Sequence, residues 1–311
     1  MSRIASRVWI AAVGVLAAGC AASPPTAWEP TAGTDPIRPC CALETPNAHH
    51  LPRLRPEEVD RRYRFRVEPD RPLRAGEPVV LRVYVEAADE PRPEAMAPYR
   101  ERRVHALLVP ESLVDVAHLH PQGEPGWLET AVFDGRHDFR FTPSHGGRYD
   151  LVLDFVDEGI WVTKVIPLTV EGPAAPPAKP DRSHTRKAGD LGVDLVLTPP
   201  EPVAKGYVSA YLRVTRNGEA VTDLEPFAGA LLHGAQIGPG GEILHFHGGS
   251  DAFGHFRFFR DPPGYRGPKL YFTPQFDRPG RYRLVAFFRR AGREHRVAFD
   301  VDVAPPSSGF R

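Results

Sequence analysis

The sequence predicts an all-β protein in which two sandwich domains follow one another along the chain. Proline and glycine account for 35 and 28 of the 311 residues. Together they make up about a fifth of the chain against an average of roughly 12%, which favours a structure rich in turns. Apolar and polar residues alternate along short segments, which is the period of a strand with one buried face. The same order of motifs also occurs twice along the chain.

The first 19 residues are typical of an export signal. Arg3 and Arg7 precede an apolar run over residues 8–18, which is too short to cross a bilayer, since a spanning helix needs about 20 residues. Small residues then lead to Cys20, a pattern that resembles the bacterial lipobox. The resemblance implies that Cys20 carries lipid and anchors the chain in the cell envelope, on the outer membrane or facing the periplasm. A plain secretory signal is the alternative.

Residues 20–58 are expected to form a flexible tether, because they are rich in proline, alanine and threonine and show no periodicity. This segment contains the adjacent pair Cys40 and Cys41, followed by His49 and His50. These four side chains can bind a soft metal ion, and the alternative is incidental thiols or an intermolecular disulfide. No cysteine follows them, so the fold has no disulfide framework.

The first domain is expected over residues 59–171. Tyr63, Phe65 and Val67 alternate with arginines, which predicts a half-buried strand. Asp157-Glu158-Gly159 favours a hairpin turn before the last strand. The other strands are expected at 79–85, in a hairpin over 104–120, from 139, and at 149–156 and 161–170.

A second copy is expected over residues 191–304, after a linker of proline, alanine and charged residues at 172–190. Residues 305–311 are expected to form a disordered tail. About seven short strands per copy favour an immunoglobulin-like β-sandwich, and almost no helix is expected beyond the signal.

Two motifs define the repeat most clearly. Phe141-Thr142-Pro143 recurs as Phe272-Thr273-Pro274, and Gly147-Arg148-Tyr149 recurs as Gly280-Arg281-Tyr282. In immunoglobulin-like sandwiches the tyrosine of the second motif occupies the place of the corner tyrosine, whose hydroxyl bonds to the backbone. A structural role is therefore predicted for both tyrosines.

Each domain also carries the same histidine pattern: one histidine on an apolar run, a turn, and a second run that ends in His-x-His. Alternate residues of a strand share a face, so both histidines of a pair point the same way. The single histidine lies opposite the pair if the turn falls within Pro110–Asp115 or Gly238–Gly241, and both segments have turn-forming composition. Two sites are therefore predicted, one of His105, His118 and His120 and one of His233, His245 and His247.

Three imidazoles on one face suit copper, zinc or nickel. The chain has only two methionines, which excludes a methionine-rich Cu(I) site and favours Cu(II) or Zn(II). The alternative is that these histidines are hydrogen-bonded core or interface residues, because His105 and His233 share their faces with apolar side chains. His137, His145 and His255 can each serve as a fourth ligand, although surface loops are the favoured interpretation.

Other function classes find no support. Charge is balanced, with 39 basic against 39 acidic residues, whereas nucleic-acid binding needs a basic face. The sequence has no Gly-x-Ser-x-Gly elbow, phosphate loop or His-Glu-x-x-His run. No enzymatic activity is therefore expected, and a metal hydrolase is the weaker alternative.

The motifs around the histidines resemble a family of exported bacterial domains, the YtkA-like, FixH-like group of immunoglobulin-like domains. The likeness covers most of residues 60–304 and rests on 105–113, 117–121, 226–230, 245–247, 279–284 and 297–301. Such domains often occur in exported proteins near copper or other heavy-metal handling systems, which implies a metal-related role. The second copy departs from the first by having Gly248 where the first has Pro121, so equal affinity at the two sites is not implied.

Together these features predict a lipid-anchored envelope protein that binds or senses a transition metal, copper above all, through its histidine hairpins. The alternative is a structural or protein-interaction module of the cell envelope that binds no metal.

Overall fold

The computed structural model describes residues 53–88, 96–97, 104–121, 136–157, 160–248 and 264–306. All of them belong to one compact unit, Ala42–Arg311. The predicted signal, Cys20, the tether up to residue 52 with Cys40 and Cys41, and the tail from residue 307 lie outside the described residues. Within the described ranges, no helix is long and apolar enough to cross a membrane.

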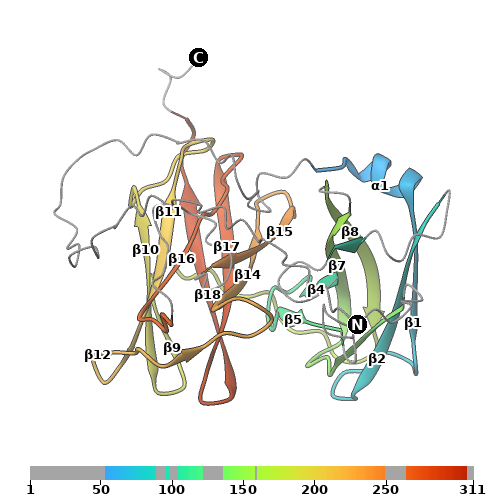
Figure 1. Cartoon of the computed structure of the whole chain (residues 1–311), viewed down its shortest axis with the longest axis horizontal. Helices are drawn as coiled ribbons and strands as arrows, with labels where there is room; N and C mark the ends of the chain where they lie inside the picture. The colour runs from blue at the N-terminus through green and yellow to red at the C-terminus, as the bar shows by residue number, and fades with distance from the viewer. Residues whose placement is uncertain are drawn as a thin grey trace, which may run out of the picture. The chain divides into compact units, whose positions relative to one another are not determined.

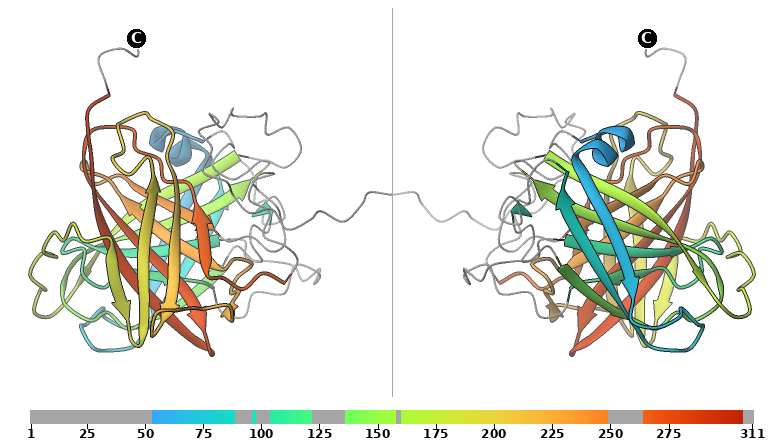
Figure 2. Two further views of the ribbon diagram at one scale, coloured as in Figure 1. Left: turned by 90° about the vertical axis from the view of Figure 1, so that its left-hand side faces the viewer. Right: turned by 90° about the vertical axis from the view of Figure 1, so that its right-hand side faces the viewer.

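The first domain is a sandwich of two antiparallel sheets (Figure 1). Strands β1, β2 and β6 form one sheet in that order; β8, β7, β4 and β5 form the other, in which the short β3 also pairs with β7. A short helix, α1, continues directly into β1 (Figure 2). The bounds are α1 (Pro56–Arg62), β1 (Tyr63–Pro69), β2 (Val79–Ala87), β3 (Met96–Ala97), β4 (Val104–Pro110), β5 (Ala117–Leu119), β6 (Arg136–Phe141), β7 (Gly147–Asp157) and β8 (Ile160–Val170).

The second domain repeats this arrangement. Strands β9, β10 and β11 form one sheet, in which β12 and β16 both pair with β11. Strands β18, β17, β14 and β15 form the other, in which β13 also pairs with β17. The bounds are β9 (Thr185–Ala188), β10 (Leu191–Thr198), β11 (Ser209–Arg216), β12 (Glu219–Ala220), β13 (Leu224–Glu225), β14 (Leu232–Ile237), β15 (Ile243–Gly248), β16 (Lys269–Phe272), β17 (Gly280–Arg290) and β18 (Arg293–Val303).

The strand order confirms the prediction of tandem immunoglobulin-like sandwiches. Leaving aside the short β3, β9, β12 and β13, each domain has its first, second and fifth strands in one sheet. The third, fourth, sixth and seventh strands form the other sheet. Because chain order and sheet order differ in the same way in both domains, equivalent residues of the two copies occupy equivalent places.

Alternating apolar residues place a core inside each sandwich. In β10, Leu191, Val193, Leu195 and Leu197 are buried, and the residues between them are more exposed. Full burial of such a side chain stabilises the fold by about 1.5–3 kcal/mol. The core of the second domain includes these four side chains, and the core of the first domain includes residues such as Leu81.

Both predicted corner tyrosines are confirmed. The Tyr149 hydroxyl donates a hydrogen bond to the His145 carbonyl at 2.9 Å. The Tyr282 hydroxyl donates to the Arg278 carbonyl at 3.0 Å. Each bond ties the start of the sixth long strand of its domain to the preceding loop, as the fold requires.

Regular structure extends into the segments predicted to be a tether and a linker. Helix α1 begins at Pro56, inside the predicted tether; proline suits the first helical position, and Glu57 and Glu58 favour the helix N-terminus. Strand β9 lies inside the predicted linker and pairs with β10. Regular secondary structure therefore begins before residue 58, the predicted end of the tether, and before residue 190, the predicted end of the linker.

The linker is also bonded to both domains. The Ala178 amide donates to the Ser112 carbonyl of the first domain at 2.7 Å. The Asp181 amide donates to Asp300 Oδ2 of the second domain at 2.7 Å. These bonds hold the linker against the folded unit.

A third apolar core lies between the domains. Strands β4 and β14 are buried along their whole length, although only alternate residues of a strand can face its own sandwich core. The remaining residues pack against the other domain. The sheet β8-β7-β4-β5 therefore packs against the sheet β18-β17-β14-β15. This shared core contains Leu107, Val109, Val116 and Val152 of the first domain and Ala235, Ile237, Val285 and Phe287 of the second.

Candidate metal centre

The β14–β15 hairpin carries the three histidines of the second domain. His233 lies directly opposite His247, as predicted. The turn forms where glycine and proline cluster, and the Gly241 amide donates to the Gly238 carbonyl at 3.0 Å. The strand-level prediction is therefore confirmed for this hairpin.

The β4–β5 hairpin carries the histidines of the first domain. Ala106 pairs with Leu119, which brings the next residues, His105 and His120, to opposite positions with ring centres 5.3 Å apart. His118 pairs with Leu107 and shares their face. Here too the predicted placement is confirmed.

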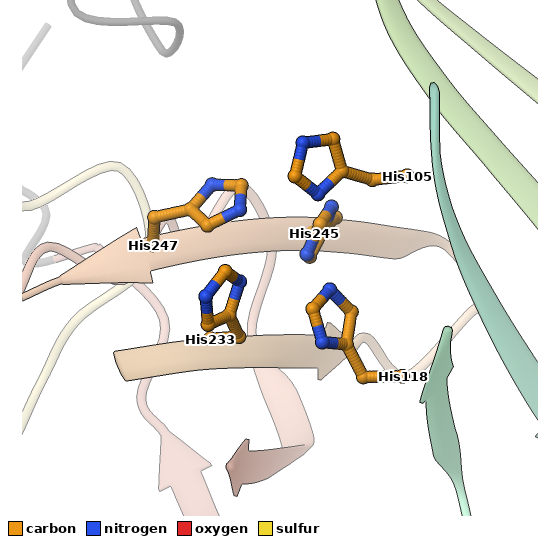
Figure 3. A group of neighbouring side chains, drawn as sticks. All are labelled: His105, His118, His233, His245 and His247. Atoms are coloured by element: carbon orange, nitrogen blue, oxygen red, sulfur yellow. The ribbon is translucent and has the colours of Figure 1, made fainter. Parts of the chain in front are cut away.

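Histidines of both domains meet in one buried cluster (Figure 3). Five of them each offer one ligand nitrogen, and these five atoms all lie within 4.8 Å of one another. Every one of the five side chains is buried. The cluster comprises His105, His118, His233, His245 and His247.

This arrangement differs from the predicted pair of separate sites. The histidine faces of the two hairpins are the faces through which the domains pack on each other. His118 of the first domain therefore lies with its ring centre 4.5 Å from His233 and 4.9 Å from His245, both of the second domain. The two predicted sites become a single interdomain centre.

The sixth predicted ligand, His120, lies at the edge of this cluster. It is half-buried, whereas the other five are buried. Its ring centre is 4.3 Å from that of His118 and 5.4 Å from that of His233. It is not one of the five whose ligand atoms converge, but it contacts the same group of rings.

Several ring nitrogens in the cluster have no hydrogen bond. Within the described residues, neither nitrogen of His118 has a hydrogen-bond partner, nor has Nδ1 of His233 or Nε2 of His245. The other nitrogen of His233 lies 2.7 Å from the Phe227 carbonyl. Burying a polar group without a partner costs about 1–3 kcal/mol, so such an arrangement calls for a ligand that the nitrogens can bind.

The cluster also favours neutral imidazole. Burial lowers the pKa of His118 well below its usual value of 6.5, and the neighbouring rings, His120 first, lower that pKa further. Burial and the neighbouring rings likewise lower the pKa of His233, against a smaller raising effect of the Phe227 carbonyl. Neutral imidazole is the form that binds a metal ion.

A carboxylate from the first domain contacts the cluster. Asp154 on β7 is buried and lies opposite His105 across the sheet. Its Oδ2 is 3.4 Å from Nδ1 of His245, in the second domain, and its Oδ1 accepts a 2.5 Å hydrogen bond from Thr163. A carboxylate behind a metal-binding histidine orients the ring and raises its basicity.

The sequence interpretation did not assign a role to Asp154. The available signal is an acidic residue inside an otherwise apolar strand, Leu151 to Val156. Such a residue is buried only when a partner faces it. That partner, His245, comes from the other domain, so no local pattern identifies it.

Two further histidines correct the predictions. His137 and His145 were expected in surface loops, but both are buried. His137 lies on β6, in the sheet that does not face the other domain. His145 Nε2 lies 3.0 Å from the hydroxyl of Ser112, and His145 Nδ1 lies 2.8 Å from the hydroxyl of Ser144. Neither is among the five converging histidines; His255, His49 and His50 lie outside the described residues.

Among the residues that the structure describes, the donors of the cluster are all imidazoles, with one carboxylate behind them. Nitrogen donors of this kind fit Cu(II) and Zn(II), whereas Mg(II) and Ca(II) prefer oxygen. The residues present therefore fit a borderline transition-metal ion.

The fold and the cluster together define a tandem immunoglobulin-like β-sandwich protein with a buried histidine centre between its domains. Residues 57–172 and 187–305 match the family described as a domain of unknown function, DUF8832. The chain belongs to this family, which matches both tandem regions. The likeness to YtkA-like, FixH-like domains stays an interpretation. No curated protein matches the chain.

The solved structures that match this chain are only distantly similar to it. The adhesin InvE of Yersinia pseudotuberculosis is 10% identical with a TM-score of 0.23, over 78% of this chain and 61% of the adhesin. Trypsin-activated alpha-2-macroglobulin of Escherichia coli is 13% identical with a TM-score of 0.24, over 79% of this chain and 16% of that one. Domains 5-6 of the S-layer protein SbsC are 7% identical with a TM-score of 0.21, over 79% of this chain and 100% of that one. Likenesses of this size do not bear on function.

Proposed function

We propose that this protein binds a divalent transition metal, Cu(II) or Zn(II), in the histidine cluster between its two domains. One observation carries the proposal: five buried histidines from both domains place a ligand nitrogen each within 4.8 Å of one another. The lowered pKa of His118 and His233 supports it, because neutral rings are ready to bind.

In this proposal the protein is a binding or sensing protein of the cell envelope and not an enzyme. Lipid on Cys20 holds the chain at the membrane, and copper is the favoured ion. Because ligands come from both domains, the bound ion also fastens the domains together. Binding to the folded state then raises stability with ligand concentration.

The alternative is a structural or protein-interaction module in which the histidines only fill the interface. The contact between His233 and the Phe227 carbonyl favours it, as does the apolar core between the domains, which includes strand neighbours of the histidines. The two functions differ in one measurable property, the retention of metal by the purified protein.

The test uses the full chain, purified without a histidine tag, with Cys40→Ser and Cys41→Ser to remove the thiols of the tether. After metal stripping, Cu(II) and Zn(II) are titrated in and retained metal is measured by mass spectrometry after desalting. We expect retention that is lost in the double variant His118→Ala, His245→Ala. His184→Ala, a histidine outside the cluster, is the matched control. Equal retention in all three proteins would reject the site.

A further inference from the structure

Several corresponding pairs of rings in the two halves of the cluster have similar separations. The rings of His118 and His120 have centres 4.3 Å apart, and their counterparts His245 and His247 have centres 4.5 Å apart. The single histidine of each domain lies near the last histidine of the other domain's pair. His105 is 5.0 Å from His247, and the equivalent pair of the other half is 5.4 Å apart.

The closest groups of three rings combine residues of both domains. The first trio consists of His118, His120 and His233, with ring centres 4.3, 4.5 and 5.4 Å apart. The second trio consists of His245, His247 and His105, with ring centres 4.5, 5.0 and 5.4 Å apart. Each trio takes a His-x-His pair from one domain and the single histidine from the other.

Groups drawn from one domain are wider. His105 and His118 have ring centres 6.1 Å apart, and His233 and His245 have centres 6.4 Å apart. The two single histidines, His105 and His233, are also 6.4 Å apart. The sets predicted from the sequence are therefore less compact than the two trios.

Coordination geometry decides how many ions these rings can serve. Zn(II) binds an imidazole nitrogen at about 2.0–2.1 Å, so the ring centre lies about 3.1–3.2 Å from the ion. Two rings at 90–110° about one ion then have centres about 4.4–5.2 Å apart, and two opposite rings have centres about 6.2–6.4 Å apart. The edges of the two trios run from 4.3 to 5.4 Å, inside the first range or within about 0.2 Å of it. Rings 6.4 Å apart would have to lie on opposite sides of an ion, which tetrahedral coordination does not allow.

We therefore propose that the cluster is a dinuclear centre for two Cu(II) or Zn(II) ions, one in each trio. This inference rests on the proposed metal-binding function and specifies its stoichiometry and ligands. It also gives His120 a role, since the first trio needs it as third ligand. The two trios adjoin at His118 and His245, whose ring centres are 4.9 Å apart, and two-metal sites hold their ions about 3.5–4 Å apart.

The two halves of the centre have different surroundings. Asp154 pairs with His105 across the sheet, and its Oδ2 lies 3.4 Å from His245 of the second trio. At the equivalent place of the second domain, Phe287 pairs with His233. Among the described residues this carboxylate places negative charge beside the second trio and not beside the first, so we expect the second trio to bind its ion first.

The experiment measures stoichiometry on the metal-stripped, tag-free full chain with Cys40→Ser and Cys41→Ser. We expect two retained equivalents of Zn(II). With Cu(II), the first equivalent gives the electron paramagnetic resonance signal of an isolated ion. The second equivalent lowers the signal per copper, because two ions this close couple magnetically. If the protein retains one equivalent and the resonance signal per copper is not lowered, the dinuclear centre is overturned and the proposed function stands. If the protein retains no metal, both are overturned.

Variants assign the two ions. His120→Ala, at a half-buried position, is expected to reduce the stoichiometry from two to one and to keep the tighter equivalent. His247→Ala, its counterpart in the second trio, is expected to keep only the weaker one. Circular dichroism of each metal-free variant verifies folding. Two equivalents retained by folded His120→Ala protein would overturn the assignment.

Discussion

The carboxylate behind the cluster offers the sharpest test of the metal centre. Asp154→Asn keeps the size of the side chain and removes its charge. Asp154 is buried, accepts a hydrogen bond from Thr163 and lies 3.4 Å from His245 Nδ1. The substitution therefore acts on one histidine of the proposed centre without opening a cavity.

The expected loss follows from the position of Asp154. Removing a partner that orients a metal ligand typically costs 10–100-fold in affinity, which is about 1.4–2.7 kcal/mol of binding free energy. In the metal-free protein the same change removes the cost of burying a charge, and the asparagine oxygen can still accept the hydrogen bond from Thr163, so we expect the melting temperature to stay the same or to rise. A lower affinity without a lower stability distinguishes support of the metal from support of the fold.

The assay is a competitive titration of Zn(II) against a chelator, with thermal unfolding measured on the metal-free protein. Asp138→Asn is the matched control. Asp138 lies in the same domain but on the sheet β1-β2-β6, where its Oδ1 accepts a 2.7 Å hydrogen bond from Arg136 Nε. The control is expected to bind zinc as the wild type does. Zinc affinity within twofold of wild type in Asp154→Asn would refute the reasoning.

Three further predictions concern the interface and its histidines. Because burial and neighbouring rings lower the pKa of His118 and His233, the unfolded chain protonates first as pH falls below 6.5. The free energy of unfolding of the metal-free protein should then decline by up to about 1.4 kcal/mol per pH unit for each of these two histidines. Urea unfolding between pH 7.5 and 5.5 measures this decline, and a free energy that does not change with pH would contradict it. Leu107→Ala, in the core shared by the two domains, should cost about 2–5 kcal/mol of stability and weaken zinc binding. Leu108→Ala, in the first domain's own core, should cost as much stability but weaken zinc binding less. Gly234→Ala would place a methyl group 2.1 Å from the ring of Phe246. This overlap should lower the free energy of unfolding by about 1–3 kcal/mol.

A shared centre has a consequence for the two domains. Their interface combines an apolar core with the histidine cluster, and Arg296 adds a 3.2 Å hydrogen bond to the Val116 carbonyl across it. An ion held by both domains adds to this interface only while it is bound. Small-angle scattering of the metal-free and metal-loaded protein can show whether the domains separate when the ion is removed.

Local patterns account well for the strands and poorly for burial. The alternation around Tyr63 and the glycine-rich turn before Glu242 correctly placed strands and hairpins, because period and turn chemistry act over a few residues. His137 was misplaced because its neighbours in β6 are charged, yet it faces inward with Phe139. The helix at Pro56 was missed because seven residues are too few for a clear period.

The sequence by itself determined that this protein consists of two copies of one β-sandwich and that each copy presents histidines on one face of a hairpin. Both properties follow from side-chain alternation and turn composition, which are local. Only the tertiary structure decided where those faces point. The faces carrying His105 and His233 pack against each other, so two predicted sites become one, and Asp154 of one domain lies against His245 of the other. Contacts between residues more than 90 positions apart depend on how whole sheets pack, and no local period encodes that.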